Sequence, residues 1–330
     1  MKLKKNDLFM GIYILSAVLF FIISIPSWLL DILLAFNIMV ALIILFNSLY
    51  AKEVLDMAAF PTMLLFTTIF RISLNVSSTK MILRDGYAGH VVATFGEFVG
   101  GGNLVIGTII FIVLIIVQFI VINKGSERVS EVTARFTLDA MAGKQMAIDS
   151  DLNTGAITDK EAAERRKKLQ QENSFFGSMD GATKYVKGDA TAGLIITAIN
   201  LVGGIIMGMM YRGQSVNEAL STYAILTIGD GLCSQIPSLL ISLSTGILVT
   251  KASSEGELGD EMVGQLFSID RVLIMVGAAL AFLGALTPLP IYIFVPLGIL
   301  LIVYGRKLKD KSGEATIEEM AEAEETEAQE

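Results

Sequence analysis

Residues 103–123, NLVIGTIIFIVLIIVQFIVIN, contain no ionisable side chain, and they are followed closely by residues 131–151, EVTARFTLDAMAGKQMAIDSD, which carry charges of both signs. The first stretch is long enough to cross the hydrocarbon core of a bilayer, which takes about 20 helical residues. The second stretch cannot lie in lipid, because charged side chains are costly there. Together they predict a membrane protein that keeps a polar block beside the membrane.

The composition extends this prediction to the whole chain. Of its 330 residues, 53% are hydrophobic and 18% are charged, whereas soluble domains are about 25% charged. We therefore expect an all-α, polytopic integral membrane protein with about eight transmembrane helices. The runs that are long and apolar enough are 9–27, 31–49, 57–75, 103–123, 190–211, 231–250, 271–287 and 289–305.

Few residue types are present that could build a metal site or a common catalytic site. Cys233 is the single cysteine and His90 is the single histidine. An internal disulfide, a cysteine metal cluster and a histidine-rich metal site are thereby excluded. A nucleotide-driven pump is not supported, because no phosphate-binding glycine loop occurs in the sequence. We expect no metal, no cofactor and no enzymatic activity.

Basic residues near the ends of the spans indicate the orientation. In an eight-span arrangement with a cytoplasmic N-terminus, one side of the membrane carries Lys2, Lys4, Lys5, Lys52, Lys124, Lys251, Arg271, Arg306, Lys307 and Lys309. Lysine and arginine concentrate on the cytoplasmic side of membrane proteins, so both termini are expected in the cytoplasm. Arg212 is a lone exception, and residues 76–102 are expected to form an amphipathic or partly re-entrant connection.

This orientation gives four regions. Residues 1–123 hold four spans, residues 124–188 form a cytoplasmic loop, residues 189–305 hold four more spans, and residues 306–330 form an acidic cytoplasmic linker. After Lys311 the linker has eight acids and no base, which accounts for the formal net charge of −8.

The loop at 124–188 contains signals for helical structure. Thr158 followed by Glu161 predicts a capping box, and Glu161 with Arg165 and Glu164 with Lys168 are spaced as ion pairs on one helix face. We expect a helix over about 159–176 that ends at Gly177. A loop that only solvates a connection is the simpler interpretation, but its length and its apolar residues favour a small folded unit.

Three motifs carry a resemblance to a known family. They are RVSEVTARFTLDAMAGKQMAIDSD (128–151), FFGSMDGATKYVKGDATAG (175–193) and LTIGDGLCSQIPSLL (226–240). The chain from Leu8 to about Tyr304 resembles the export-gate family of type III secretion, and the stretch FPTMLLFTTIFRISLNVSSTKMIL resembles its flagellar branch more than its injectisome branch. Two departures from the family pattern are Ala142, where a proline is usual, and the end of the chain at Glu330, before the family's large cytoplasmic domain. We therefore expect this chain to represent the membrane half of a longer protein.

The resemblance implies a role in protein export. It implies a homo-oligomeric ring of nine subunits in the bacterial inner membrane, at the flagellar basal body, that couples the proton motive force to export of unfolded flagellar subunits. Protons are the implied coupling ion, with sodium as an alternative. The implied partners are other membrane export-gate proteins, membrane lipid and, through the absent domain, the export ATPase complex and chaperone–substrate complexes, with no nucleic acid. The implied signature residues of the loop are Arg128, Glu131, Arg135, Asp139, Lys144, Asp149 and Asp151.

Ionisable residues within or beside the spans are the candidates for an ion pathway, because such groups usually face protein or water. Arg71 lies deep in the third span, where a packing salt bridge is equally consistent with the sequence. Asp230 lies between two glycines in IGDG, which predicts a broken helix, with residues 219–228 as a short re-entrant helix before the break.

Asp189 precedes the fifth span, with Lys184 and Lys187 nearby as charge partners. From its position alone it is either a helix N-cap or a proton-handling group. The resemblance favours proton handling, because the matching aspartate of the family is regarded as a proton relay. Gln118, Asn200, Glu97 and Asn103 are polar residues in or near spans that are expected to bond between helices.

Three other function classes remain for comparison. An injectisome export gate is the nearest alternative. An ion-coupled secondary transporter would share the buried carboxylates, but it usually shows two matching interrupted spans, and the sequence has one, at Asp230. An intramembrane aspartyl protease would need a second aspartate at matching depth and a Gly-x-Gly-Asp signature, which the sequence lacks.

Overall fold

The computed structural model describes residues 5–100, 103–251, 258–286 and 290–308. The chain divides into two units, residues 1–255 and 256–330, and each unit is considered by itself. Every regular element of the described residues is a helix, as the composition predicts. Most of the acidic segment 306–330 lies outside the described residues.

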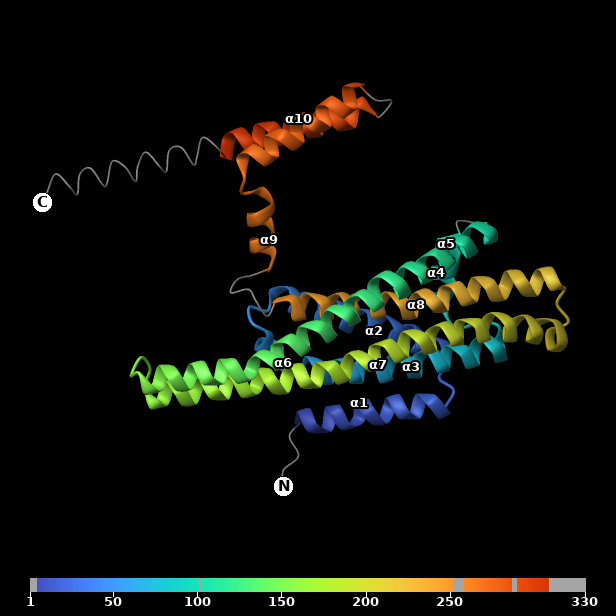
Figure 1. Ribbon diagram of the computed structural model, residues 1–330. Helices are drawn as coiled ribbons and strands as arrows, with labels where there is room; N and C mark the ends of the chain where they lie inside the picture. The colour runs from blue at the N-terminus through green and yellow to red at the C-terminus, as the bar shows by residue number, and fades with distance from the viewer. Residues whose placement is uncertain (1–4, 101–102, 252–257, 287–289, 309–330) are drawn as a thin grey trace, which may run out of the picture. The chain divides into compact units, whose positions relative to one another are not determined.

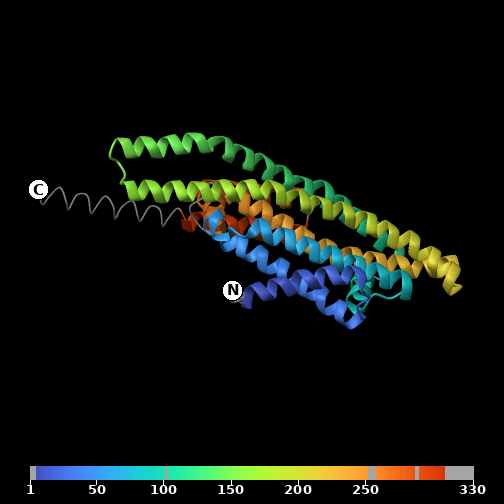
Figure 2. The same ribbon diagram turned by 90° about the horizontal axis from the view of Figure 1, so that it is seen from below.

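The first unit is a bundle in which the longest helices run lengthwise beside one another (Figures 1 and 2). Helices α3, α7 and α8 pack together, and α2 and α4 pack against α8. In chain order the elements are α1 (Lys5–Ile22), α2 (Ser27–Tyr50), the 3₁₀ turn η1 (Val54–Met57), α3 (Phe60–Asp85), α4 (His90–Gly100), α5 (Leu104–Ile116), the π-helical segment η2 (Val117–Asn123), α6 (Lys124–Asn153), α7 (Asp159–Arg212) and α8 (Val216–Thr250).

Six of the eight expected spans are matched by long apolar helices among the described residues. Among the described residues, six helical stretches are long and apolar enough to cross a membrane: Ser27–Tyr50, Val54–Asp85, Leu104–Asn153, Asp159–Arg212, Val216–Thr250 and Ile291–Leu308. The expected spans at 9–27 and 271–287 correspond to α1 and to α10 (Asp270–Leu286). Within the described residues, α1 has 18 residues and includes the apolar run Gly11–Ile22, and α10 has 17 residues.

Helix α7 is longer than the sequence predicts. The expected end at Gly177 is wrong, because the helix continues for 54 residues from Asp159 to Arg212. The glycine keeps a helical conformation, and a glycine inside a helix costs only about 0.5–1 kcal/mol. Packing against α3 and α6 outweighs that cost. The second half of the polar loop and the fifth span are therefore one continuous helix.

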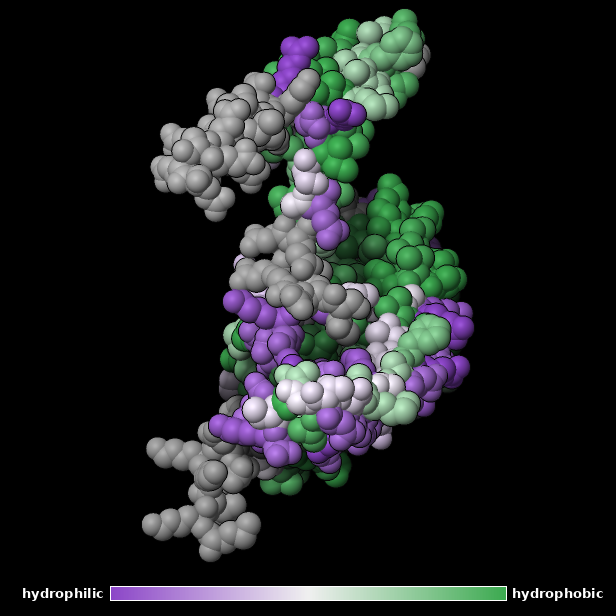
Figure 3. Space-filling view, turned by 60° about the vertical axis from the view of Figure 1, so that its left-hand side comes forward, coloured by the Kyte–Doolittle hydropathy of each residue, from purple (hydrophilic) through white to green (hydrophobic). Residues whose placement is uncertain are grey.

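Helices α6 and α7 form a long antiparallel hairpin, which extends beyond the rest of the first unit (Figure 1). The predicted capping box at Thr158 and Glu161 is present at its turn, where hydrogen bonds from Thr158 lower the pKa of Glu161. Ile148, Ile157 and Ala162 are buried together near the turn. Hydrophilic residues gather at this end of the first unit (Figure 3). The segment thus has a core of its own.

The expected ion pairs along the first turns of α7 are replaced by pairs between elements. Arg165 lies 3.3 Å from Asp151 of α6, and Lys168 lies 2.7 Å from Glu53 near η1. The hydrogen bond with Glu53 raises the pKa of Lys168. Near the base of the hairpin, Phe175 and Phe176 are buried with Phe60 of α3. These contacts fix the hairpin to the bundle, so it is more than a solvated connection.

The stretch 76–102 is divided between two helices. Helix α3 continues to Asp85 and ends at Gly86, which has the left-handed φ of 60°. Helix α4 has 11 residues, which is too short to cross a bilayer. Its first amides are capped by another helix, because Asp31 of α2 accepts hydrogen bonds from the backbone of His90 and Val91 at 3.0 and 2.9 Å.

The second unit contains α9 (Leu258–Phe267), α10 (Asp270–Leu286) and the helix Ile291–Leu308. The last two pack closely through glycine, since a Cβ built on Gly277 would lie 2.6 Å from the carbonyl oxygen of Gly298.

Candidate functional site

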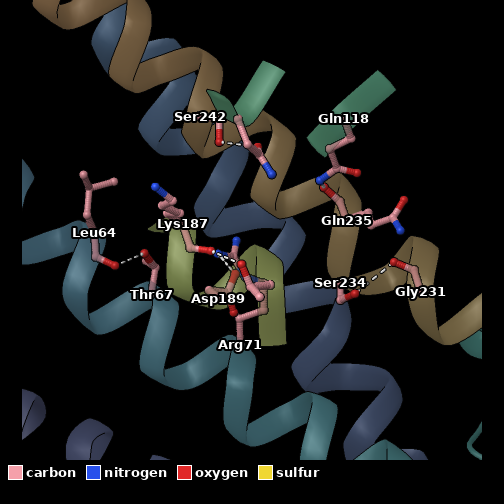
Figure 4. A network of polar contacts seen from close by, with 12 residues as sticks. Leu64, Thr67, Arg71, Gln118, Lys187, Asp189, Gly231, Ser234, Gln235 and Ser242 are labelled. Atoms are coloured by element: carbon pink, nitrogen blue, oxygen red, sulfur yellow. Dashed lines mark hydrogen bonds and ion pairs between the residues drawn. The ribbon is translucent and has the colours of Figure 1, made fainter. Parts of the chain in front are cut away.

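Arg71 and Asp189 form a buried ion pair between α3 and α7 (Figure 4). Their side chains are 1% and 4% exposed, and Arg71 Nη2 donates to Asp189 Oδ2. Asp189 lies deep inside α7, so the N-cap interpretation is wrong: the helix begins at Asp159 and the amides near Asp189 are already paired within it. The packing salt bridge considered for Arg71 is present, and its partner is a pathway candidate.

Asp189 of this pair borders a small cavity. Among the described residues, Arg71 Nε and Nη1, Asp189 Oδ1 and Ser238 Oγ have no hydrogen-bond partner. The cavity beside Asp189 has a volume of about 30 Å³, and about 10–15 Å³ suffices for one water molecule. Its lining includes Asn75, Gln118, Asn123, Thr197, Ser234 and Gln235. Buried polar atoms require partners, so this cavity is suited to ordered water.

A second polar pair lies farther along α7 and joins it to α8. Asn200 of α7 donates to Asp230 of α8 at 2.8 Å, and Ser78 of α3 lies beside the same carboxylate. Both members are buried, at 0% and 3% exposure. The bond expected between helices at Asn200 is therefore present.

The helix break predicted at Asp230 is wrong. Helix α8 runs from Val216 to Thr250 without interruption and contains the predicted re-entrant segment 219–228. The two glycines serve close packing instead. A Cβ on Gly229 would lie 1.8 Å from the carbonyl oxygen of Val92, and one on Gly231 would lie 2.4 Å from the Phe111 ring. The two glycines of IGDG thus mark a close contact between helices and do not interrupt the backbone of α8.

The polar residues occupy one face of each of three helices. Asp189 and Asn200 are eleven positions apart, about 16 Å of helix rise, and both face α3 and α8. Positions three, four, seven or eleven apart share a helix face. The stripe comprises Arg71, Asn75 and Ser78 on α3, Asp189, Thr197 and Asn200 on α7, and Asp230, Ser234 and Ser238 on α8.

A π-helical segment also lines the cavity beside Asp189. Within η2, Gln118 donates to the carbonyl oxygen of Gln235 at 3.0 Å, and Asn123 accepts from Ser242 at 3.0 Å. The bond between helices expected of Gln118 is thus present. Sequence analysis passed over Asn75 and Asn123, although Asn75 could have been found as the residue four positions after Arg71.

The charge partners expected for Asp189 are bonded elsewhere. Lys184 lies 2.9 Å from Asp180, and Lys187 lies 2.9 Å from Glu127 of α6. The bond with Asp180 raises the pKa of Lys184. The sequence distance was misleading because Asp189 faces the bundle interior while both lysines lie on the exposed side.

The signature residues lie along α6, away from the buried stripe. Three of them pair with α7: Lys144 with Glu172 at 3.4 Å, Asp149 with Arg166 at 2.6 Å, and Asp151 with Arg165 at 3.3 Å. Arg128 and Arg135 lie 3.5 and 3.6 Å from Glu131, and Asp139 is exposed. Three of the seven signature residues therefore join the two helices of the hairpin.

Three further polar residues lie outside the buried stripe. Asn103 caps α5 by accepting from Val105 and Ile106, and Glu97 is exposed on α4; neither shows the bond between helices that was expected. Lys251, which the sequence marked only as a basic residue near a span end, is 1% exposed and donates to the carbonyl oxygens of Leu49 and Ala51. Among the described residues, no group of three or more His, Cys, Asp or Glu side chains is placed to hold a metal ion.

Comparison with known proteins places this arrangement in a family. The model of the FHIPEP family matches residues 17–330. The chain belongs to the FHIPEP family. This confirms the resemblance to the type III secretion export-gate proteins that the three motifs carry.

Named relatives of this FHIPEP chain come from both branches. It is 51% identical over 327 residues to flagellar biosynthesis protein FlhA of Bacillus subtilis, covering 99% of this chain and 48% of that protein. It is 48% identical over 289 residues to FlhA of Salmonella typhimurium, covering 86% and 42%. It is 44% identical over 310 residues to protein MxiA of Shigella flexneri, covering 93% and 45%. The chain thus spans about half the length of these relatives, and no solved structure matches it.

Proposed function

We propose that this chain forms the membrane part of a flagellar protein export gate and that it couples proton entry to export of unfolded subunits. Its family and its similarity to two FlhA proteins support the flagellar assignment. The observation that carries the proton coupling is the buried Arg71–Asp189 pair beside a cavity large enough for water. This role requires no catalysis by the chain, no metal and no cofactor.

The pair has two charge states with different energetics. With Asp189 ionised, the two charges neutralise one another inside the bundle. Arginine cannot release its proton in a protein, so protonation of Asp189 leaves Arg71 buried without a counter-charge. An unpaired buried charge is strongly destabilising. The arrangement of α3 and α7 that suits the ionised carboxylate is therefore different from the one that suits the protonated carboxylate.

Helix α7 connects this change to the hairpin. Asp189 and the hairpin residues Phe175 and Phe176 belong to the same helix, and both phenylalanines are buried against α3 and its surroundings. A movement of α7 relative to α3 at Asp189 would therefore be felt at the base of the hairpin. Packed elements of this kind shift between discrete arrangements rather than bending continuously.

The proposal includes location and partners. The chain would lie in the bacterial inner membrane at the flagellar basal body, with the hairpin in the cytoplasm, and would assemble as a homo-oligomeric ring with other membrane export-gate proteins. The export ATPase complex and chaperone–substrate complexes are further proposed partners. Protons are the proposed coupling ion, and sodium is the alternative for the same carboxylates.

The test is export in cells that carry the full-length gene with a substituted Asp189. Asp189→Asn keeps the shape of the side chain and removes its titration, so we expect at least a tenfold loss of exported flagellar subunits, with normal protein level and assembly. Asp189→Glu keeps titration and should retain measurable export. Normal export by an assembled Asp189→Asn protein would exclude Asp189 as the coupling group.

An injectisome gate is the second candidate, because MxiA is 44% identical and the low calcium response locus protein D of Yersinia pestis is 45% identical to this chain. The higher identities to FlhA proteins favour the flagellar reading. A secondary transporter is disfavoured, since the interruption predicted at Asp230 is an unbroken helix. Restoration of swimming in a strain that lacks its flagellar gate protein would separate the two branches.

A further inference from the structure

Two small cavities lie in series between Asp189 and the exposed base of the hairpin. The inner one borders Asp189 and has a volume of about 30 Å³. The outer one has about 20 Å³ and is lined by Ser126, Glu127, Thr183, Val186, Lys187, Ser242 and Thr245 together with Asn123. Each exceeds the 10–15 Å³ or so that one water molecule needs. Asn123 lines both cavities, so it stands at their junction.

The junction is polar. Ser242 Oγ of α8 donates to Asn123 Oδ1 at 3.0 Å, and Ser126 Oγ of α6 donates to the carbonyl oxygen of Ser242 at 2.7 Å. Asn123 and Ser242 are 8% and 2% exposed. A buried constriction made of amide and hydroxyl groups can exchange hydrogen bonds with water on either side, which an apolar one cannot do. Water molecules in the two cavities can therefore both form hydrogen bonds with the groups at the junction.

The outer cavity ends at an ion pair that reaches the surface. Lys187 Nζ lies 2.9 Å from Glu127 Oε1, and the two side chains are 57% and 24% exposed. Both residues also line the outer cavity. Exposed ion pairs of this kind are weak, at about 0–1 kcal/mol, so this one can open and close readily. Solvent thus lies one weak contact away from the outer cavity.

The π-helical segment explains why the junction exists. In an α-helix, residues five positions apart are rotated by about 140° from one another, so Gln118 and Asn123 would not both face α8. The wider turn of η2 (Val117–Asn123) directs both toward it, where they bond Gln235 and Ser242. Single-turn π segments inside α-helices occur often at functional sites. Here the irregular turn places a polar side chain at the only point shared by the two cavities.

We propose that water and protons pass between Asp189 and the hairpin side of the bundle through the Asn123–Ser242 junction, with the Glu127–Lys187 pair at the outer end. Asn123 is a positioning residue of this route. The inference rests on the proposed exchange of protons at Asp189 and names the path that this exchange takes. It requires that the inner cavity be reached from the hairpin side, past Asn123.

Silver ions in chloride-free buffer test the route, because they are small enough to follow water and react with thiols. Cys233 is the only cysteine of the chain, so Cys233→Ala provides a background without thiols. Ser238→Cys then places a thiol at the inner cavity, whose lining includes Ser238. The full-length protein in lipid nanodiscs, with any further cysteine replaced, is exposed to silver, and the remaining thiol is counted after denaturation with a maleimide.

We expect Asn123→Leu to slow the reaction of the Ser238→Cys thiol at least tenfold, because an apolar side chain closes the junction, whereas Asn123→Ser should leave it fast. A thiol at Ser174→Cys, on the exposed side of the hairpin, is the matched control and should react equally in all variants. Ser242→Val closes the opposite wall and replaces Asn123→Leu if that variant does not fold. An unchanged rate with the junction closed by a folded variant would overturn the route. Silver access in the Asn123 variants reports the path and export by Asp189→Asn cells reports the coupling, so a failure of one is distinguishable from a failure of the other.

Discussion

At the residue scale, the buried guanidinium of Arg71 dominates the energetics of the site. The side chain is 1% exposed, and Asp189 is the acidic side chain that pairs with it in the described structure. Taking two charges out of water costs desolvation free energy, so a buried ion pair adds little to the stability of the fold. A role other than stability is therefore expected for this pair. In this chain Asp189 borders the water-sized cavity, which is why we assign the pair to coupling.

A double-mutant cycle separates the two roles. Arg71→Met leaves a carboxylate that can take up a proton, while Asp189→Leu leaves a cation that cannot lose one. We expect both single variants to lose stability, by about 3–5 kcal/mol where a buried charge stays unpaired, and Asp189→Leu to be the worse. The double variant, which buries no charge, should recover most of the loss. Thermal unfolding midpoints in detergent give the comparison.

Export is the second readout of the same cycle. The double variant should assemble but export nothing, because its core is neutral and has no titrating group. A double variant that both assembles and exports normally would show that the pair only fixes packing. If the double variant lost as much stability as the two single variants together, the side chains would not interact.

The sequence could predict that Arg71 needs a partner, but not which one. Asp189 has two lysines within five positions, which suggests local pairing along the chain. Its helix turns those lysines outward, and the true partner is more than a hundred positions away. Local spacing describes neighbours on a helix, whereas the partner across the bundle depends on how α3 and α7 pack.

At the element scale, close helix packing depends on glycines that sequence analysis interpreted as breaks. Gly229 on α8 faces the backbone of α4, and Gly96 on α4 faces Ile225 of α8 in return. Without a Cβ on either residue, the two backbones approach closely, as small residues allow in membrane helices. This contact lies next to Asp230, and it holds the short helix α4 against the polar stripe.

Two glycine-to-alanine variants test this interpretation. A Cβ on Gly229 would lie 1.8 Å from the Val92 carbonyl oxygen, whereas one on Gly177 of α7 would meet nothing within 4 Å. We expect Gly229→Ala to lower stability by about 1–3 kcal/mol, the usual range for overpacking. Gly177→Ala should raise it by about 0.5–1 kcal/mol through helix propensity. Thermal unfolding of both variants is the measurement, and a stabilised Gly229→Ala protein would contradict the packing.

The sequence predicted correctly that the chain is helical and that a helix begins at Thr158, but it did not predict that α7 and α8 continue through their glycines. Thr158 and Glu161 signal a helix start through local chemistry, and that start is observed. Gly177 and the IGDG motif signal a stop by the same kind of rule, yet both helices continue. Glycine has two uses, a special φ and a close contact, and only the packed neighbours decide between them.

At the scale of the whole molecule, basic residues separate between the two ends of the first unit. Lys251 bonds carbonyl oxygens at the end of α2, beside Lys52, and Lys168 of the hairpin pairs with Glu53 at that same end. At the other end, Arg84 is neutralised by a two-pronged contact with Asp85 at 2.9 and 2.8 Å, and Arg212 donates to the carbonyl oxygen of Arg84. Lysine and arginine residues near the span ends are therefore more numerous at the hairpin end, which holds Lys52, Lys124 and Lys251.

This asymmetry predicts the orientation in the membrane, because lysine and arginine near span ends are retained on the cytoplasmic side. In a Cys233→Ala background, thiols at Ser150→Cys and Ser174→Cys report the hairpin, and a thiol at Ser221→Cys reports the far end near Arg212. All three positions are exposed. A membrane-impermeant maleimide added to intact cells should label only Ser221→Cys, and the same reagent added to inverted membrane vesicles should label only the two hairpin thiols. Labelling of the hairpin in intact cells would place the Glu127–Lys187 pair on the outside and reverse the direction of the proposed proton path.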